Sequence, residues 1–206
     1  MKPCVDNYAI QASQAKRHFL TYDQQELIRR CNLNFDDGYF YIRFLGSPYR
    51  ICRHTGNTER QQGSAWVDGN GFGEVMTILD WLCDSRADRS LSGNWINVIT
   101  AGAGFHTAFQ EESRDPYAEC FDKDLAGFSK ACEALGGERQ PGADISYAIE
   151  LVDGLKILVQ FWQGDEEFSS RVRCLWDGNV LQYIRYETTF YAVGLLLHRI
   201  KDYMEK

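Results

Sequence analysis

The chain has 206 residues, of which 44% are hydrophobic and 25% charged, and these values are ordinary for a globular protein. Its formal net charge is −7 and it has no basic run, whereas binding to duplex nucleic acid needs a surplus of lysine and arginine. No apolar stretch approaches the roughly 20 residues that a membrane helix requires. We therefore predict one domain over residues 1–206, with no nucleic acid and no membrane among its partners.

Seven cysteines are scattered along the chain, and no two of them form a C-x-x-C pair. Zinc ribbons and self-contained iron–sulfur modules group their cysteines in such pairs, so neither is expected here. The odd number of cysteines, and the polar segment that follows Met1 where a signal peptide would be apolar, favour reduced thiols. The cysteine pattern therefore predicts a cytoplasmic protein.

The N-terminal part of the chain predicts two helices and then a β-hairpin. Apolar residues recur at helical spacing over about the first 30 residues. Asp23 is placed to cap a second helix, with Glu26 in the capping-box position. Residues 39–44 alternate between apolar and polar side chains, turn at a Gly-Ser-Pro sequence, and alternate again over residues 49–53. Such alternation on both sides of a turn is typical of a hairpin.

The middle of the chain predicts mainly helices. The polar, glycine-rich residues 54–71 predict a long loop, and residues 72–83 have the apolar spacing of a helix. Residues 95–99 predict a short strand. A further helical turn is expected after Pro116, and residues 124–135 predict a helix that two glycines terminate.

The C-terminal third has the clearest pattern. Residues 145–151 alternate strictly, and an Asp-Gly turn then leads into residues 155–162, which are apolar at nearly every position. We interpret this second segment as a central strand covered on both faces. Residues 172–176 and 180–184 predict two more strands, and the last helix is expected to begin near Glu187.

These elements predict an α+β fold, because strands joined by tight turns pair antiparallel and the helices are grouped instead of following each strand. The expected sheet contains the strands of residues 145–184 and is extended by the hairpin of residues 39–53. The helices at residues 124–135 and 187–204 are expected to pack against it.

An acidic segment directly after the central strand is the first candidate site. Asp165, Glu166 and Glu167 are consecutive, and Asp177 and Glu187 can approach them from neighbouring strand or helix ends. Clustered carboxylates can hold a divalent cation, or raise one another's pKa and share acid/base work.

A plainer interpretation of the same residues is a solvated hairpin turn with Phe168 packed inward, and a Glu187 that only stabilises the start of a helix. Trp162 and Trp176 lie on the two strands that flank the turn. We expect them to pack in the core, against each other, although rings rimmed by carboxylates can also line a ligand pocket.

Two glycine-rich turns, at residues 69–73 and 102–104, precede predicted helices, where backbone amides can hold a phosphate. Neither turn fits G-x-G-x-x-G, so a tight turn is the favoured interpretation. His106 follows the second turn and can serve as a base or contact an anion, but a surface histidine is the simpler alternative.

Several short motifs occur in a specific order: residues 44–50 (FLGSPYR), 91–95 (LSGNW), 108–109 (AF) before 115–116 (DP), 134–137 (ALGG), 162–168 (WQGDEEF), and Tyr183 before Glu187. Their order resembles the bacterial and archaeal domain-of-unknown-function family 3786. That family has no established activity, so the resemblance implies no catalytic residues. Some relatives look fused to a four-cysteine iron–sulfur module, which this chain lacks, and this implies a setting in anaerobic redox or one-carbon metabolism.

Two functions follow from these patterns. The first is a non-catalytic accessory or binding module for a protein or a small molecule, and it predicts an exposed apolar patch. The second is a hydrolase or acid/base enzyme, which requires the carboxylates of residues 165–167 to converge with Asp177 or Glu187 around a concave site. The sequence identifies no cofactor, and its hairpin edges leave a homo-oligomer open.

Overall fold

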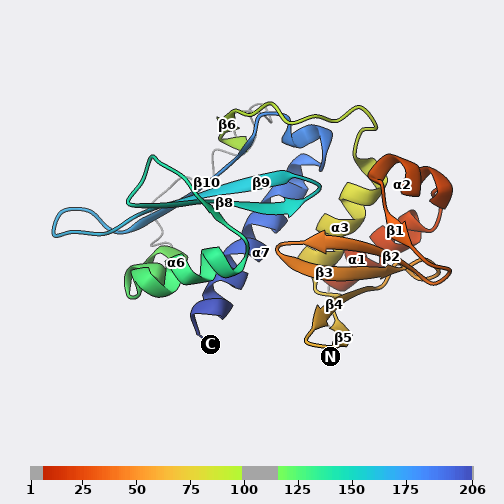
Figure 1. Cartoon of the computed structure of the whole chain (residues 1–206), viewed down its shortest axis with the longest axis horizontal. Coiled ribbons are helices and arrows are strands. Elements are labelled where there is room, and N and C mark those ends of the chain that lie inside the picture. Colours follow the sequence, from red (N-terminus) through yellow and green to blue (C-terminus); the bar gives the residue numbers. More distant parts are fainter. Residues whose placement is uncertain (1–6, 99–115, 206) are drawn as a thin grey trace.

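The computed structural model describes residues 7–98 and 116–205, and within them the strands form two separate antiparallel sheets of five strands each (Figure 1). The predicted α+β class is therefore confirmed. The first sheet comes from residues 34–68, and the second from residues 138–177 together with a short strand at residues 95–96. In spatial order, the first sheet contains β1 (Asn34–Phe35), β2 (Tyr39–Phe44), β3 (Ser47–Cys52), β4 (Thr58–Gln62) and β5 (Ala65–Asp68).

The hairpin predicted around residues 45–48 is confirmed as β2 and β3, which pair from Tyr39 opposite Cys52 to Phe44 opposite Ser47. The loop predicted over residues 54–71 is wrong, because β4 and β5 form a second hairpin there. The sequence of β4, Thr-Glu-Arg-Gln-Gln, has no apolar alternation. β4 is a strand because its backbone pairs with β3 and β5, and no pattern in its own sequence predicts this pairing.

The second sheet is built around the strand predicted to be central. In spatial order it contains β6 (Trp95–Ile96), β10 (Arg171–Asp177), β9 (Leu155–Trp162), β8 (Ile145–Val152) and β7 (Glu138–Arg139). Most side chains of β9 are buried, as expected for a strand covered on both faces. Asp153 and Gly154 both have positive φ, which is the backbone that a tight hairpin turn between β8 and β9 needs.

Two predictions about this sheet are wrong. The hairpin of residues 39–53 does not extend it, because β2 and β3 belong to the other sheet. Residues 180–184 are not a strand either, since Val180–Gln182 is a 3₁₀-helix, η2. Val180, Tyr183 and Ile184 are buried while Leu181 is exposed, and β6 pairs with the end of β10 where a further strand was expected.

The helices pack around and between the sheets, with α7 passing behind the second sheet and beside α3 (Figure 1). Asp23 caps α2 as predicted, by accepting a hydrogen bond from the Gln25 amide at 2.9 Å. None of the described helices has the length and apolar character needed to span a membrane. The described α-helices are α1 (Asn7–Phe19), α2 (Gln24–Cys31), α3 (Phe72–Asp84), α5 (Pro116–Asp122), α6 (Leu125–Ala134) and α7 (Tyr186–Met204).

One cluster of buried apolar side chains connects the two sheets. Within it lies a buried charge, Arg199 of α7, which donates hydrogen bonds to the Tyr49 hydroxyl and, at 3.4 Å, to the Leu45 carbonyl. The same guanidinium lies 3.4 Å from a carboxylate oxygen of Glu74 on α3. Arg199 therefore ties α7 to α3 and to the hairpin of the first sheet.

Candidate functional site

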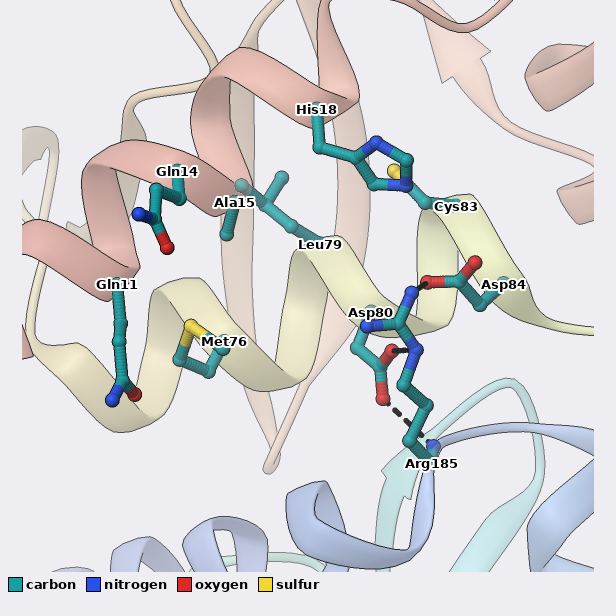
Figure 2. A pocket seen from close by; sticks show the side chains of 10 residues that line it. All are labelled: Gln11, Gln14, Ala15, His18, Met76, Leu79, Asp80, Cys83, Asp84 and Arg185. Carbon is teal, nitrogen blue, oxygen red and sulfur yellow. Dashed lines mark hydrogen bonds and ion pairs between the residues drawn. The ribbon is translucent and has the colours of Figure 1, made fainter.

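A cavity of about 480 Å³ opens between α1, α3 and the residue that precedes α7 (Figure 2). This volume lies within the usual range for small-molecule sites. One wall comes from α1 and the other from α3, while Arg185 lies beside the C-terminal part of α3. The lining residues are Gln11, Gln14, Ala15, His18, Met76, Leu79, Asp80, Cys83, Asp84 and Arg185.

Arg185 connects two aspartates of α3 at one side of the cavity (Figure 2). Its backbone amide donates to Asp80 Oδ2 at 2.7 Å, and its Nε lies 3.1 Å from Asp80 Oδ1. Its Nη2 donates to Asp84. Asp80 and Asp84 are four residues apart, so they project from the same face of the helix and reach one guanidinium.

Asp80 depends on this contact because its side chain is only 5% exposed. Burial raises the pKa of the Asp80 carboxyl, and hydrogen bonds from Thr188 and from the Arg185 amide act against that rise, together with the Arg185 charge. A buried carboxylate that lost its arginine would lose most of the compensation for its lost hydration. The main role of Arg185 in this structure is therefore to stabilise the buried Asp80 carboxylate.

Tyr22 and His18 continue the polar side of the cavity. The Tyr22 hydroxyl donates to Asp84 Oδ1 at 3.1 Å and lies 3.2 Å from His18 Nε2. Burial, followed by the charge of Asp84 and the hydrogen bond to it, raises the pKa of Tyr22 to about 12. Tyr22 is thus protonated at neutral pH and acts as a hydrogen-bond donor, not as a base.

The remaining surface of the cavity is apolar or inert. Ala15, Met76 and Leu79 offer hydrocarbon and thioether surface between the two walls. Burial, and then the charge of Asp84, raises the pKa of the Cys83 thiol to about 12. Because the thiolate is the nucleophilic form, Cys83 is unreactive at neutral pH. The cavity can therefore hold a ligand, but its described residues include no activated thiol.

The sequence contains one signal for this site that apolar periodicity does not reveal. Asp80 stands between Leu79 and Trp81, and it is the only charged residue among the buried residues of this helix. A carboxylate in such a position needs a partner. That partner, Arg185, is 105 positions away in the chain, so only the packing of α7 beside α3 reveals the pair.

The acidic segment that the sequence suggested as a site lies elsewhere, in the connection between β9 and β10. Asp165, Glu166 and Glu167 are all exposed. Asp165 Oδ1 accepts hydrogen bonds from the backbone amides of Glu167 at 2.8 Å and Phe168 at 2.7 Å, which makes an Asx-type turn. Phe168 is 70% exposed, so its predicted packing inside the turn is wrong.

The predicted convergence of carboxylates is also wrong. Asp177 lies at the opposite end of β10 from the acidic turn, six residues beyond Arg171, or roughly 20 Å at the usual strand rise. Glu187 is exposed in the first turn of α7. Among the described residues, no group of three or more His, Cys, Asp or Glu side chains could hold a metal ion.

The two tryptophans do not pack on each other. Trp162 is opposite Arg171 in the β9–β10 ladder, whereas Trp176 is opposite Ile157, which precedes Trp162 by five positions. Trp176 is 1% exposed and belongs to the core, as expected from its apolar surroundings. Trp162 is partly exposed, and the Arg171 guanidinium lies 5.8 Å from its ring centre.

Asp177 organises a loop. Its carboxylate accepts hydrogen bonds from the backbone amides of Ser92 at 2.9 Å, Gly93 at 2.8 Å and Asn179 at 2.8 Å. It thereby fixes residues 91–95, one of the motifs that carried the family resemblance, to the end of β10. A cavity of about 200 Å³ beside this loop is lined by Leu91, Gly93, Trp95, Gly154, Lys156 and Asp177.

The glycine-rich turn at residues 69–73 leads into α3, with Gly71 as the residue that precedes the helix. Asn70 stabilises this turn, because its side-chain oxygen accepts hydrogen bonds from the Thr58 amide at 3.0 Å and Lys16 Nζ at 2.7 Å. The second glycine-rich turn, at residues 102–104, and His106 lie outside the described residues.

Comparison with known proteins identifies a family but no characterised relative. A family model described as Domain of unknown function (DUF3786) matches residues 23–199, and this match begins after α1. No curated protein and no solved structure showed a significant match to the chain. The match includes α3 and Arg185, and it agrees with the resemblance seen in the motif order. The chain belongs to the DUF3786 family of domains of unknown function.

Proposed function

We propose that the chain is a non-catalytic binding module that holds a small organic molecule in the cavity between α1, α3 and Arg185. The observation that carries this proposal is the Asp80–Arg185–Asp84 bridge at the side of a cavity of about 480 Å³. Binding sites typically combine an apolar lining with a few fixed polar groups, and this cavity has both.

Binding is favoured over catalysis by the state of the titratable groups in and beside the cavity. The raised pKa values of Cys83 and Tyr22 keep both groups protonated at neutral pH. Arg185 and Asp80 satisfy each other and form a rigid polar anchor. Such fixed, mutually compensated charges suit the recognition of a ligand better than the transfer of a proton.

A reducing, cytoplasmic setting is part of the proposal. The six described cysteines are all free thiols, which supports a reducing compartment. An accessory role beside iron–sulfur or one-carbon enzymes is the context that the family resemblance implies. A protein partner would then be the source or the recipient of the bound molecule.

The proposal is tested by thermal unfolding of the purified, reduced chain against a library of small polar and amphipathic molecules. A molecule at about 100 times its Kd should add roughly 2.7 kcal/mol to the free energy of unfolding. Met76→Trp would fill the cavity, while Leu181→Trp places the same ring at a position that is 43% exposed and does not line the cavity.

The stabilisation is expected to disappear in Met76→Trp and to persist in Leu181→Trp. A ligand that stabilises Met76→Trp as much as the natural chain binds elsewhere, and that result would remove the cavity as the site. A library without any stabilising molecule would contradict the small-molecule function itself.

A further inference from the structure

The charges around the cavity are unequal. Two carboxylates, those of Asp80 and Asp84, line it together with a single guanidinium, that of Arg185. The neighbouring hydroxyl of Tyr22 is a donor to Asp84 and adds no positive charge. A bound molecule therefore meets one more negative than positive group among the aspartate and arginine side chains.

The single guanidinium is already shared between the two aspartates. Arg185 contacts Asp80 with its backbone amide and its Nε, and Asp84 with its Nη2. An anion that attracted the guanidinium away from α3 would leave the buried Asp80 carboxylate with only its hydrogen bonds from Thr188 and the Arg185 backbone amide. Because one arginine charge faces two carboxylates, an anion is attracted less strongly here than a cation.

Acceptor groups, in contrast, remain available on both walls. Each carboxylate oxygen has two lone pairs, and in Asp84 one oxygen receives Arg185 while the other receives Tyr22, so each can accept again. On the opposite wall, the side chains of Gln11 and Gln14 make no hydrogen bond to another described residue. Figure 2 shows both glutamines on α1, with Met76 and Leu79 on α3 between them and the Arg185 bridge.

We propose that the cavity selects molecules with a cationic, hydrogen-bond-donating head, such as a primary amine, on a short apolar body. This inference rests on the proposed function. The ammonium group would donate to Asp84, while the hydrocarbon part would lie on Ala15, Met76 and Leu79. Asp84 selects the head by its charge, and the excess of carboxylates over guanidinium disfavours the opposite charge.

Three probes of equal chain length separate the contribution of the head: hexylamine, hexanol and hexanoate. Their binding is measured by calorimetric titration at neutral pH and low salt, because partly exposed charges are screened by salt. Hexylamine is expected to bind about fivefold more tightly than hexanol, with hexanoate the weakest of the three.

Two variants and one control test whether this order of affinities depends on the charge at the cavity. Asp84→Asn should bring hexylamine close to hexanol, whereas Asp88→Asn, at an aspartate that pairs with Arg86 outside the cavity, should leave the natural order unchanged. Gln14→Lys places a positive charge on the α1 wall and leaves the Arg185 bridge untouched. It should weaken hexylamine binding and strengthen hexanoate binding.

Hexanol or hexanoate binding as tightly as hexylamine would overturn this inference and leave the small-molecule function standing. Failure of all three probes to bind would overturn it as well, and the library screen against Met76→Trp then decides separately whether the cavity binds any molecule. An unchanged amine preference in both Asp84→Asn and Gln14→Lys would show that the head lies elsewhere.

Discussion

Gly46 and Leu135 approach so closely that a Cβ at Gly46 would lie 2.8 Å from the Leu135 carbonyl oxygen. Gly46 is in the turn between β2 and β3, and Leu135 follows α6. Beside them, the Leu45 amide donates to the Leu151 carbonyl at 2.9 Å, from the first sheet to the second. Two motifs of the family resemblance, residues 44–50 and 134–137, thus meet at the joint between the sheets.

Gly46→Ala should lower the free energy of unfolding by about 2–4 kcal/mol, because Gly46 has a φ of +71° and no room for a side chain. Gly63→Ala is the matched control, with a φ of +60° and no atom within 4 Å of the added Cβ. It should cost only about 1 kcal/mol, which is the backbone cost alone. Urea denaturation of both variants measures the difference, and equal losses would contradict the close approach.

Arg199→Met should destabilise the chain by about 3 kcal/mol, because it leaves Glu74, Tyr49 and the Leu45 carbonyl without their buried donor. Arg171→Met changes an exposed arginine at the start of β10 and should cost less than about 0.5 kcal/mol. Adding Glu74→Gln to Arg199→Met should cost less than the sum of the single changes. Strict additivity would show that Arg199 and Glu74 do not interact.

Asp177→Asn should cost about 2–3 kcal/mol, since three backbone amides point at its buried carboxylate and an asparagine side chain has only one oxygen to accept them. Asp165→Asn is the comparison at the other end of β10, where the aspartate is exposed and asparagine forms the same kind of turn. Its cost should stay within about 0.5 kcal/mol. Thermal unfolding at pH 7 ranks the two variants, and similar losses would contradict the structural role of Asp177.

The contribution of Asp177 should depend on pH. Burial raises the pKa of this carboxyl, but hydrogen bonds from Ser92, Asn179 and Gly93 outweigh burial and lower it overall. A folded-state pKa below the unfolded value means stabilisation that is present above the unfolded pKa and lost as the pH falls through the folded one. The stability difference between the natural chain and Asp177→Asn should therefore shrink below about pH 4. A difference that stays constant down to pH 2.5 would be inconsistent with this assignment.

Cys52 should react with iodoacetamide before Cys83 and Cys132 do. Burial raises the pKa of the Cys52 thiol, but hydrogen bonds from Thr55 and from the backbone amides of His54 and Thr55 lower it overall. Burial raises the pKa of both Cys83 and Cys132, and both are inaccessible. Timed alkylation at pH 8 followed by peptide mass mapping gives the order, which urea should abolish.

Elements with a strong apolar period could be predicted from the sequence, and those held by pairing alone could not. The alternation of β8, the continuous apolar run of β9 and the spacing of α3 each led to the correct element. The polar strand β4 was missed because only its neighbours β3 and β5 make it a strand. The segment Val180–Gln182 has apolar residues that suit a strand, yet the Asp177 turn leads it into a helical turn.

The candidate site was harder to predict than the fold because charge clusters in a sequence need not be clusters in space. Asp165, Glu166 and Glu167 are adjacent in the chain, and the structure leaves them in solvent. Asp80 and Arg185 are distant in the chain, and the structure brings them into contact. An isolated aspartate in an apolar helix was therefore the more informative signal, although it does not name its partner.

In helix α1, the residues that anchor the helix are different from the residues that face the cavity. It is held at both ends, because the Tyr8 ring centre lies 4.7 Å from that of Phe72, Phe19 is buried, and Lys16 Nζ donates to Asn57 at 2.8 Å and Asn70 at 2.7 Å. Its cavity-facing glutamines, Gln11 and Gln14, are exposed and lie outside the region that matches the family. Substitutions of these two glutamines are therefore expected to change one wall of the cavity without disturbing the buried core.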